Sequence, residues 1–101
     1  MMNSINAARL DDQEKTALDY ALDDINEEVY LFGSRADITK KGGDIDILVF
    51  TKADPLETSQ EIGLKFFEKC EEKIDVVVMD PNNLTEEQQA FLNTITKVRI
   101  R

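Results

Sequence analysis

Histidine and tryptophan are missing from this chain of 101 residues, and cysteine occurs once, at Cys70. Without histidine there is no imidazole base, no zinc site built on histidine and no Cys-His dyad, and a single cysteine excludes an intrachain disulfide. Any catalysis must therefore use carboxylates, hydroxyls, amines or bound metal. Cys70 falls within an apolar helical pattern, so we expect it to be a small core residue.

Long apolar runs are also missing. No stretch of the sequence is apolar over the length that a membrane helix needs, and the first residues, MMNSINAARLDDQEK, lack the apolar region of a secretory signal. We therefore expect a cytoplasmic protein with no membrane association.

Positive charge is scarce. The chain has 12 basic and 21 acidic residues, which gives a formal net charge of −9. Such a charge repels phosphate backbones, so we expect no direct binding of nucleic acid. A basic protein is the easier partner to accommodate.

The sequence does contain a clear succession of periodic segments. With 42% hydrophobic residues, residues 1–101 are expected to form one small domain with a single core. Helical spacing and β-branched runs predict the order α-β-β-α-β-α. The segments are Asp11–Ile25, Glu28–Phe32, Asp44–Thr51, Pro55–Cys70, Lys73–Met79 and a last helix from about Thr85. We expect an α+β (mixed α/β) fold in which a small mixed sheet packs on helices.

Apolar spacing also predicts which helix residues face the core. In the helix 55–70 the expected core residues are Leu56, Gly63, Phe66, Phe67 and Cys70. In the last helix they are Phe91, Ile95 and Val98. The tail, Lys97–Arg101, alternates like an edge strand, and the pattern leaves open whether it is frayed or joins the surface of a partner.

Two aspartates stand at the start of the strand 44–51, although aspartate is a poor strand residue. Side chains two residues apart project from one face, so Asp44 and Asp46 point away from the apolar residues of their strand. Asp75 has the same phase in the strand 73–79. If the strands are neighbours, the three carboxylates converge, and Mg²⁺ or Mn²⁺ would offset their repulsion. Carboxylates that bridge two such ions, about 3.5–4 Å apart, are used in nucleotidyl transfer.

A Gly-Ser turn precedes these aspartates. Gly33 allows the backbone to approach a phosphate closely, and the N–H groups of Ser34 and Arg35, with the Ser34 hydroxyl, can donate to it. Arg35 adds a permanent cation. The alternative for Arg35 is a surface ion pair with Asp37.

The combination resembles a known family. Gly33-Ser34, nine intervening residues and Asp44-Ile45-Asp46, with Asp75 on a later strand, resemble the DNA polymerase β-like nucleotidyltransferase superfamily. The sequence FGSR at Phe32–Arg35 and the short length are most similar to its minimal nucleotidyltransferase (MNT) branch. The resemblance covers roughly Val29–Asp80.

The resemblance implies a nucleotidyltransferase fold and metal-dependent transfer of a nucleoside monophosphate, AMP from ATP being the expected case. It implies that Asp44 and Asp46 are ligands of two Mg²⁺ (or Mn²⁺) ions, and that Asp75 is a third carboxylate that bridges a metal or acts as base. Gly33, Ser34 and Arg35 would bind the nucleotide.

The resemblance also implies a biological setting. Many minimal nucleotidyltransferases are antitoxins paired with a helical HEPN ribonuclease toxin, and some adenylylate a tyrosine of that toxin. We therefore expect a hetero-oligomer in which the partner supplies the surface that holds the acceptor. Two functions stay open: an enzyme that modifies its partner, and a non-catalytic binding module that neutralises a toxin by occlusion.

Overall fold

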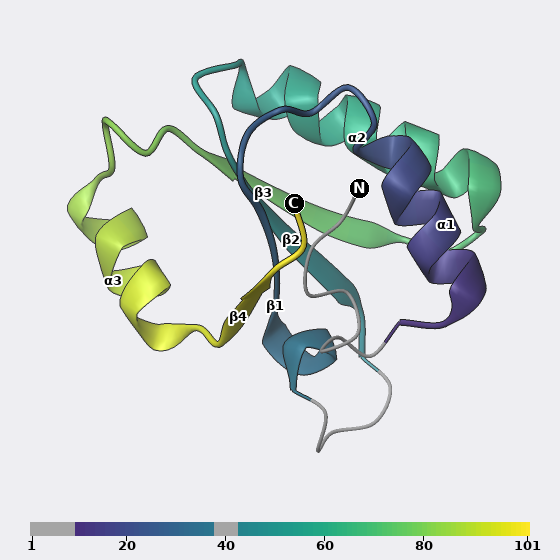
Figure 1. Ribbon diagram of the computed structural model, residues 1–101. Coiled ribbons are helices and arrows are strands. Elements are labelled where there is room, and N and C mark those ends of the chain that lie inside the picture. The colour runs from purple at the N-terminus through teal and green to yellow at the C-terminus, as the bar shows by residue number, and fades with distance from the viewer. Residues whose placement is uncertain (1–9, 38–42) are drawn as a thin grey trace.

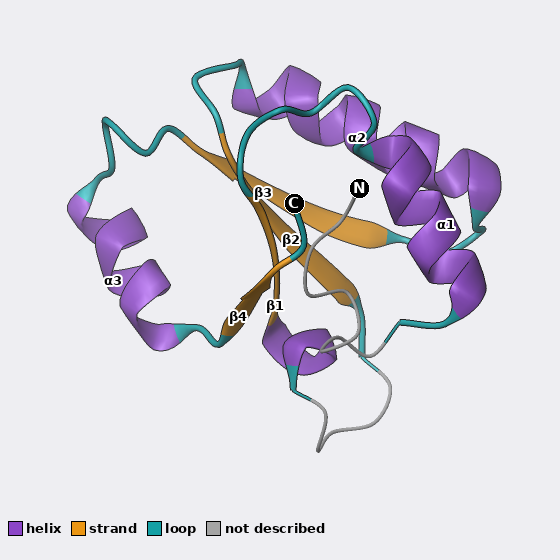
Figure 2. Ribbon diagram, in the orientation of Figure 1, coloured by secondary structure: helices purple, strands orange, loops and turns teal. Residues whose placement is uncertain are grey.

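The computed structural model describes residues 10–37 and 43–101, and these residues contain a four-stranded mixed sheet in the order β3-β2-β1-β4 (Figure 2). The strands are β1 (Val29–Phe32), β2 (Ile45–Phe50), β3 (Ile74–Met79) and β4 (Lys97–Arg99). β1 is antiparallel to β2 and to β4, whereas β2 and β3 are parallel. This architecture confirms the predicted α+β fold class.

Helices cover both faces of the sheet. α1 (Asp12–Ala21) and α2 (Pro55–Lys69) lie side by side on one face, and α3 (Glu86–Thr94) lies on the other (Figure 1). A short 3₁₀ helix, η2 (Gly33–Ala36), follows β1 directly. Within the described residues, no helix is long and apolar enough to cross a membrane.

The helices begin where side chains can satisfy their first N–H groups. The Asp11 carboxylate accepts from the backbone N–H of Glu14, whose own carboxylate accepts from the N–H of Asp11. Thr85 and Gln88 make the same reciprocal pair at α3. These reciprocal pairs are capping boxes, and they fix the start of each helix.

The sheet alternates as its sequence predicts. Ile45, Ile47 and Val49 of β2 belong to the main core, beneath α1 and α2. Leu48 of β2 lies in a smaller cluster with Phe32 and Met79, against which apolar residues of α3 pack. Because Asp46 is two residues from Leu48, its side chain projects from the α3 face of the sheet.

The predicted core stripe of α2 is partly wrong. Phe66 and Cys70 are buried, but Leu56 is 65% exposed and Phe67 is 55% exposed. Ile62 is buried in their place, with 1% exposure. The predicted stripe combined residues of two helix faces, because periodicity alone does not show how α2 is rotated against α1 and β3.

The C-terminus also differs from the prediction. α3 ends at Thr94, so Ile95 caps the helix and Val98 lies in β4 instead of on a helix face. β4 pairs with β1 of its own sheet, Leu31 lying opposite Val98. The first helix is likewise shorter than predicted, because it ends at Ala21 and is followed by residues that favour turns.

Candidate active site

The two strand aspartates lie opposite each other. Asp46 of β2 and Asp75 of β3 are direct partners in the parallel pair, so both side chains project from the same face of the sheet. Asp46 is half-buried and Asp75 is exposed. Asp44, just before β2, is also exposed. β2 and β3 are therefore neighbours, which is the condition that the predicted convergence of carboxylates required.

The surroundings of Asp46 disfavour its negative charge. Burial, and then the nearby charges of Asp75 and Asp44, raise the pKa of Asp46 above its ordinary value. A raised pKa means that the ionised carboxylate is disfavoured where it stands. The three oxygen donors fit a hard divalent cation, because a positive charge at this point would remove the repulsion that raises the pKa.

The Gly-Ser turn lies directly against the Asp46 carboxylate. Gly33 has a positive φ of 72°, and a Cβ atom on it would come within 2.7 Å of Asp46 Oδ2. Gly43 also has a positive φ, and a Cβ atom there would collide with the Ser34 hydroxyl oxygen. Glycine at both positions lets the turn, the end of the following loop and Asp46 pack together.

Arg35 is held by Glu14 and by the backbone of Gly43. Its guanidinium forms an ion pair with Glu14 of α1 at 2.9 Å, and its Nε donates to the carbonyl oxygen of Gly43 at 2.9 Å. These contacts tie the turn after β1 both to α1 and to the residue before Asp44. The predicted role of Arg35 in nucleotide binding stays a prediction, and the structure adds a positioning role for Glu14.

Glu14 could have been noticed in the sequence. It occupies the apolar side of α1, spaced three, four and seven residues before Ala17, Leu18 and Ala21, and it is 3% exposed. A carboxylate at such a position requires a partner. Burial acts to raise the pKa of Glu14, but the hydrogen bonds from Arg35 and from the Asp11 N–H outweigh burial, so the pKa of Glu14 is lowered.

Glu14 is also part of a second acidic group. Among the described residues, Asp11, Glu14 and Glu72, rather than the three strand aspartates, form the trio whose carboxylate oxygens all lie within 4.8 Å of one another. Arg35 and the capping N–H groups already occupy this cluster. Glu72 also accepts a hydrogen bond from the buried Cys70 thiol, and burial with this contact raises the pKa of Cys70 to about 11. Cys70 is thus the inert core residue that its pattern predicts.

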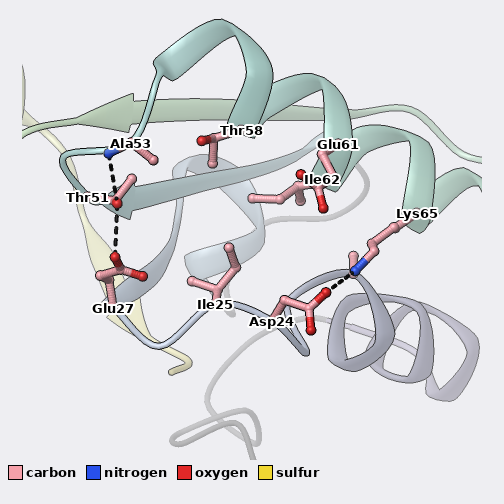
Figure 3. Close-up of a pocket in the computed structure, with 10 residues that line it drawn as sticks. Asp24, Ile25, Glu27, Thr51, Ala53, Thr58, Glu61, Ile62 and Lys65 are labelled. Atoms are coloured by element: carbon pink, nitrogen blue, oxygen red, sulfur yellow. Dashed lines mark hydrogen bonds and ion pairs between the residues drawn. The ribbon is translucent and has the colours of Figure 1, made fainter.

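A pocket of about 280 Å³ lies at the C-terminal end of β2, away from Asp44 and Asp46 (Figure 3). Thr51 donates to Glu27 at 3.0 Å, and Lys65 of α2 donates to Asp24 at 2.8 Å. Four of the polar side chains that line this pocket are thus paired with one another. It opens just after β2, whereas Asp44 and Asp46 stand where β2 begins, so this pocket is separate from the strand aspartates.

A smaller groove, of about 250 Å³, opens beside the turn itself. Gly33 and Asp37 form one wall, and Thr94, Ile95 and Thr96 form the other. The groove places the end of α3 next to the turn that contacts Asp46. Gly33 therefore belongs both to this groove and to the turn that contacts Asp46.

Comparison with known proteins identifies the family. A family model described as a nucleotidyltransferase domain matches residues 14–100, which is most of the chain. The chain belongs to this nucleotidyltransferase family. The match confirms the resemblance to the polymerase β-like superfamily, whereas the MNT branch stays a prediction. No curated protein matched the chain.

Membership accounts for the arrangement of this nucleotidyltransferase domain. The matched region includes the turn at Gly33, both aspartates of β2 and Asp75 of β3. Glu14 is the first residue matched. Transfer of a nucleotidyl group is thus the activity of the family to which the site belongs.

Proposed function

We propose that this protein transfers a nucleoside monophosphate, AMP from ATP, to a protein partner. The observation that carries the proposal is the in-register pair of Asp46 and Asp75, placed against the glycine turn at Gly33, in a chain of the nucleotidyltransferase family. The partner is a HEPN-type helical toxin, and this chain is its antitoxin.

Different residues of the site would bind the metal and the nucleotide. Asp44, Asp46 and Asp75 would hold two Mg²⁺ or Mn²⁺ ions, which would neutralise the phosphate charge and lower the pKa of the attacking hydroxyl. The backbone N–H groups after Gly33 and the Ser34 hydroxyl donate to the phosphates. Arg35 keeps this turn in place through Glu14, and its charge adds to the positive potential around the phosphates.

The reaction is a displacement at phosphorus. The oxygen of the acceptor hydroxyl, a tyrosine of the partner, forms a bond to the α-phosphorus of ATP as the bond to pyrophosphate breaks. Pyrophosphate leaves with the electron pair of the broken bond, and the hydroxyl proton passes to a carboxylate. Asp75 is the proposed acceptor of this proton, because it is the exposed member of the opposed pair.

The charge of the chain suits such a partner. A ribonuclease that attracts RNA presents basic surface, and a chain with a net charge of −9 is attracted to it at long range. The same acidic charge disfavours RNA as the acceptor.

The experiment is to purify this chain and the protein encoded beside it, mix them with ATP and Mg²⁺, and weigh both by intact mass spectrometry. The partner should gain the mass of one or more AMP groups. The Asp44→Asn/Asp46→Asn double variant should add none, because it removes two anionic ligands while keeping their shape. A partner that gains mass equally with the double variant would refute the assigned site.

Occlusion is the second candidate, and the exposed apolar side chains of α2 favour it. A chain that acts in this way would inhibit its partner without changing its mass. The double variant would then bind and inhibit as well as the natural chain. This outcome would reject transfer and keep the antitoxin role.

A further inference from the structure

The Arg35 side chain lies where several segments of the chain meet. Its Nη1 donates to Glu14 Oε1 of α1 at 2.9 Å, and its Nε donates to the carbonyl oxygen of Gly43 at 2.9 Å. The same Oε1 atom accepts the backbone N–H of Asp11 at 2.9 Å, so this atom joins the start of α1 to the turn η2. We call the contacts among Arg35, Glu14 and Gly43 the Arg35 junction.

The junction also reaches the segment that leads into β3. Carboxylate oxygens of Asp11, Glu14 and Glu72 all lie within 4.8 Å of one another, and Glu72 stands just before β3 begins at Ile74. Like charges at this separation repel, and the Arg35 cation beside Glu14 offsets part of that repulsion. Arg35 therefore lies close to the segments that enter β2 and β3, the two strands whose aspartates form the candidate site.

Pairing with a buried carboxylate restricts what the guanidinium can do. The Arg35 side chain is 14% exposed and the Glu14 side chain is 4% exposed. If Arg35 left Glu14 to contact a phosphate, a buried carboxylate would lose its cation, which is among the costliest changes in a folded protein. We therefore expect the guanidinium to keep its place when nucleotide binds, so that the phosphate contacts are left to the N–H groups and the hydroxyl of the turn.

Gly43 connects the junction to the candidate site. It directly precedes Asp44, and a Cβ atom on it would collide with the Ser34 hydroxyl. The hydrogen bond from Arg35 to the Gly43 carbonyl oxygen thus fixes the residue that packs against Ser34 and leads into Asp44.

We propose that Arg35 is a positioning residue, whose side chain holds the Gly-Ser turn and Asp44 in place for metal and nucleotide without contacting the nucleotide. Glu14 anchors that side chain. This role rests on the metal and nucleotide site of the proposed function, but not on the acceptor or the partner. Its test therefore uses this chain alone.

The experiment titrates Mn²⁺ alone into the full chain and measures free Mn²⁺ by electron paramagnetic resonance. Arg35→Lys is the main variant, because it keeps the charge but its ammonium cannot reproduce the rigid fork of the guanidinium. It should lower the Mn²⁺ affinity about tenfold, as the loss of groups that orient metal ligands does. Arg99→Lys, at an exposed position of β4, is the matched control and should change the affinity less than about twofold.

Glu14→Gln tests the anchor. It should lower the Mn²⁺ affinity by a similar factor, whereas Asp19→Asn, which removes an exposed negative charge from the same helix, should have a smaller effect. Adding Arg35→Lys to Glu14→Gln should lower the affinity less than about twofold further, because both changes break the same junction. Circular dichroism verifies that each variant is folded at the temperature of the titration. If Glu14→Gln does not fold, Glu14→Asp, which keeps the charge but shortens the side chain, takes its place.

Two results would overturn the proposal alone. Unchanged Mn²⁺ affinity in Arg35→Lys and Glu14→Gln, with a lower unfolding temperature, would mean that the pair stabilises the fold without placing the aspartates. Normal Mn²⁺ affinity in Arg35→Lys, with at least about tenfold more affinity lost for ATP than for AMP in the presence of Mn²⁺, would mean that the guanidinium contacts the terminal phosphates.

A different result would refute the proposed function. If the natural chain binds no Mn²⁺ up to about 5 mM, the metal site itself is refuted, and with it this role of Arg35.

Discussion

Two carboxylates of the core region have opposite surroundings. Glu14 is buried but receives Arg35 and a backbone N–H, so its pKa is lowered. Asp46 is half-buried beside Asp75 and Asp44, so its pKa is raised. The ionised form of Glu14 therefore stabilises the fold, whereas the ionised form of Asp46 destabilises it.

These signs predict opposite effects of two substitutions that remove the same charge. In metal-free buffer at neutral pH, Asp46→Asn should raise the free energy of unfolding by up to about 1 kcal/mol, because it relieves repulsion from Asp75. Glu14→Gln should lower it by about 1–3 kcal/mol, because Arg35 loses its charged partner. Thermal unfolding in the presence of EDTA measures both.

The pH dependence checks the cause. The gain from Asp46→Asn should shrink as the pH falls through the raised pKa, because the natural Asp46 then binds a proton and loses its charge. The loss from Glu14→Gln should shrink only at lower pH, as the natural Glu14 is protonated below its lowered pKa. A destabilising Asp46→Asn would show that Asp46 is a structural hydrogen-bond acceptor.

At the scale of elements, glycine has different roles in the turn and in α2. Gly33 adopts a left-handed conformation with Asp46 Oδ2 in the way of a Cβ atom, whereas Gly63 lies inside a helix with open space around it. Substitution by alanine at both positions therefore distinguishes a glycine that the backbone conformation requires from one that alanine can replace.

Gly33→Ala should lower the free energy of unfolding by about 1–2 kcal/mol and displace Asp46. Gly63→Ala should raise it by about 0.5–1 kcal/mol, because alanine is the better helix former. Urea denaturation of both variants measures the two values. Equal effects would mean that η2 and the candidate site do not depend on the backbone at Gly33.

At the scale of the whole molecule, the C-terminus closes the fold. Ile100 is fully buried in the main core, and its N–H donates to the carbonyl oxygen of Val29. Arg101 Nε donates to the carbonyl oxygen of Ile25 at 2.6 Å. The last residues thus cover the edge of β1 and tie the end of the chain to the segment after α1.

Ile100→Ala should therefore destabilise the whole domain by about 2–4 kcal/mol, as expected for a large core side chain. Leu64→Ala is the matched control, since Leu64 is 69% exposed and its removal should change stability by less than about 0.5 kcal/mol. Denaturant unfolding followed by fluorescence and circular dichroism measures both. A loss at Ile100 no larger than at Leu64 would mean that β4 is an accessory strand.

The sequence alone determined what depends on neighbours along the chain. Alternation placed Asp44, Asp46 and Asp75 on the polar phase of their strands, and capping residues set the starts of α1 and α3. The Gly-Ser turn and the spaced aspartates were sufficient to predict the family. These features follow from the period of each element and from backbone groups only a few residues away.

Only the tertiary structure decided what depends on contacts between distant segments. Pairing of β2 with β3 set Asp46 opposite Asp75, and folding brought Glu14 to Arg35, across 21 residues. The rotation of α2 places Ile62 in the core and leaves Phe67 exposed. The C-terminal strand β4 pairs with the edge of β1. Periodicity predicts which side of an element is apolar, but it does not predict which other element packs against that side. Packing and charge in the complete fold determine that partner.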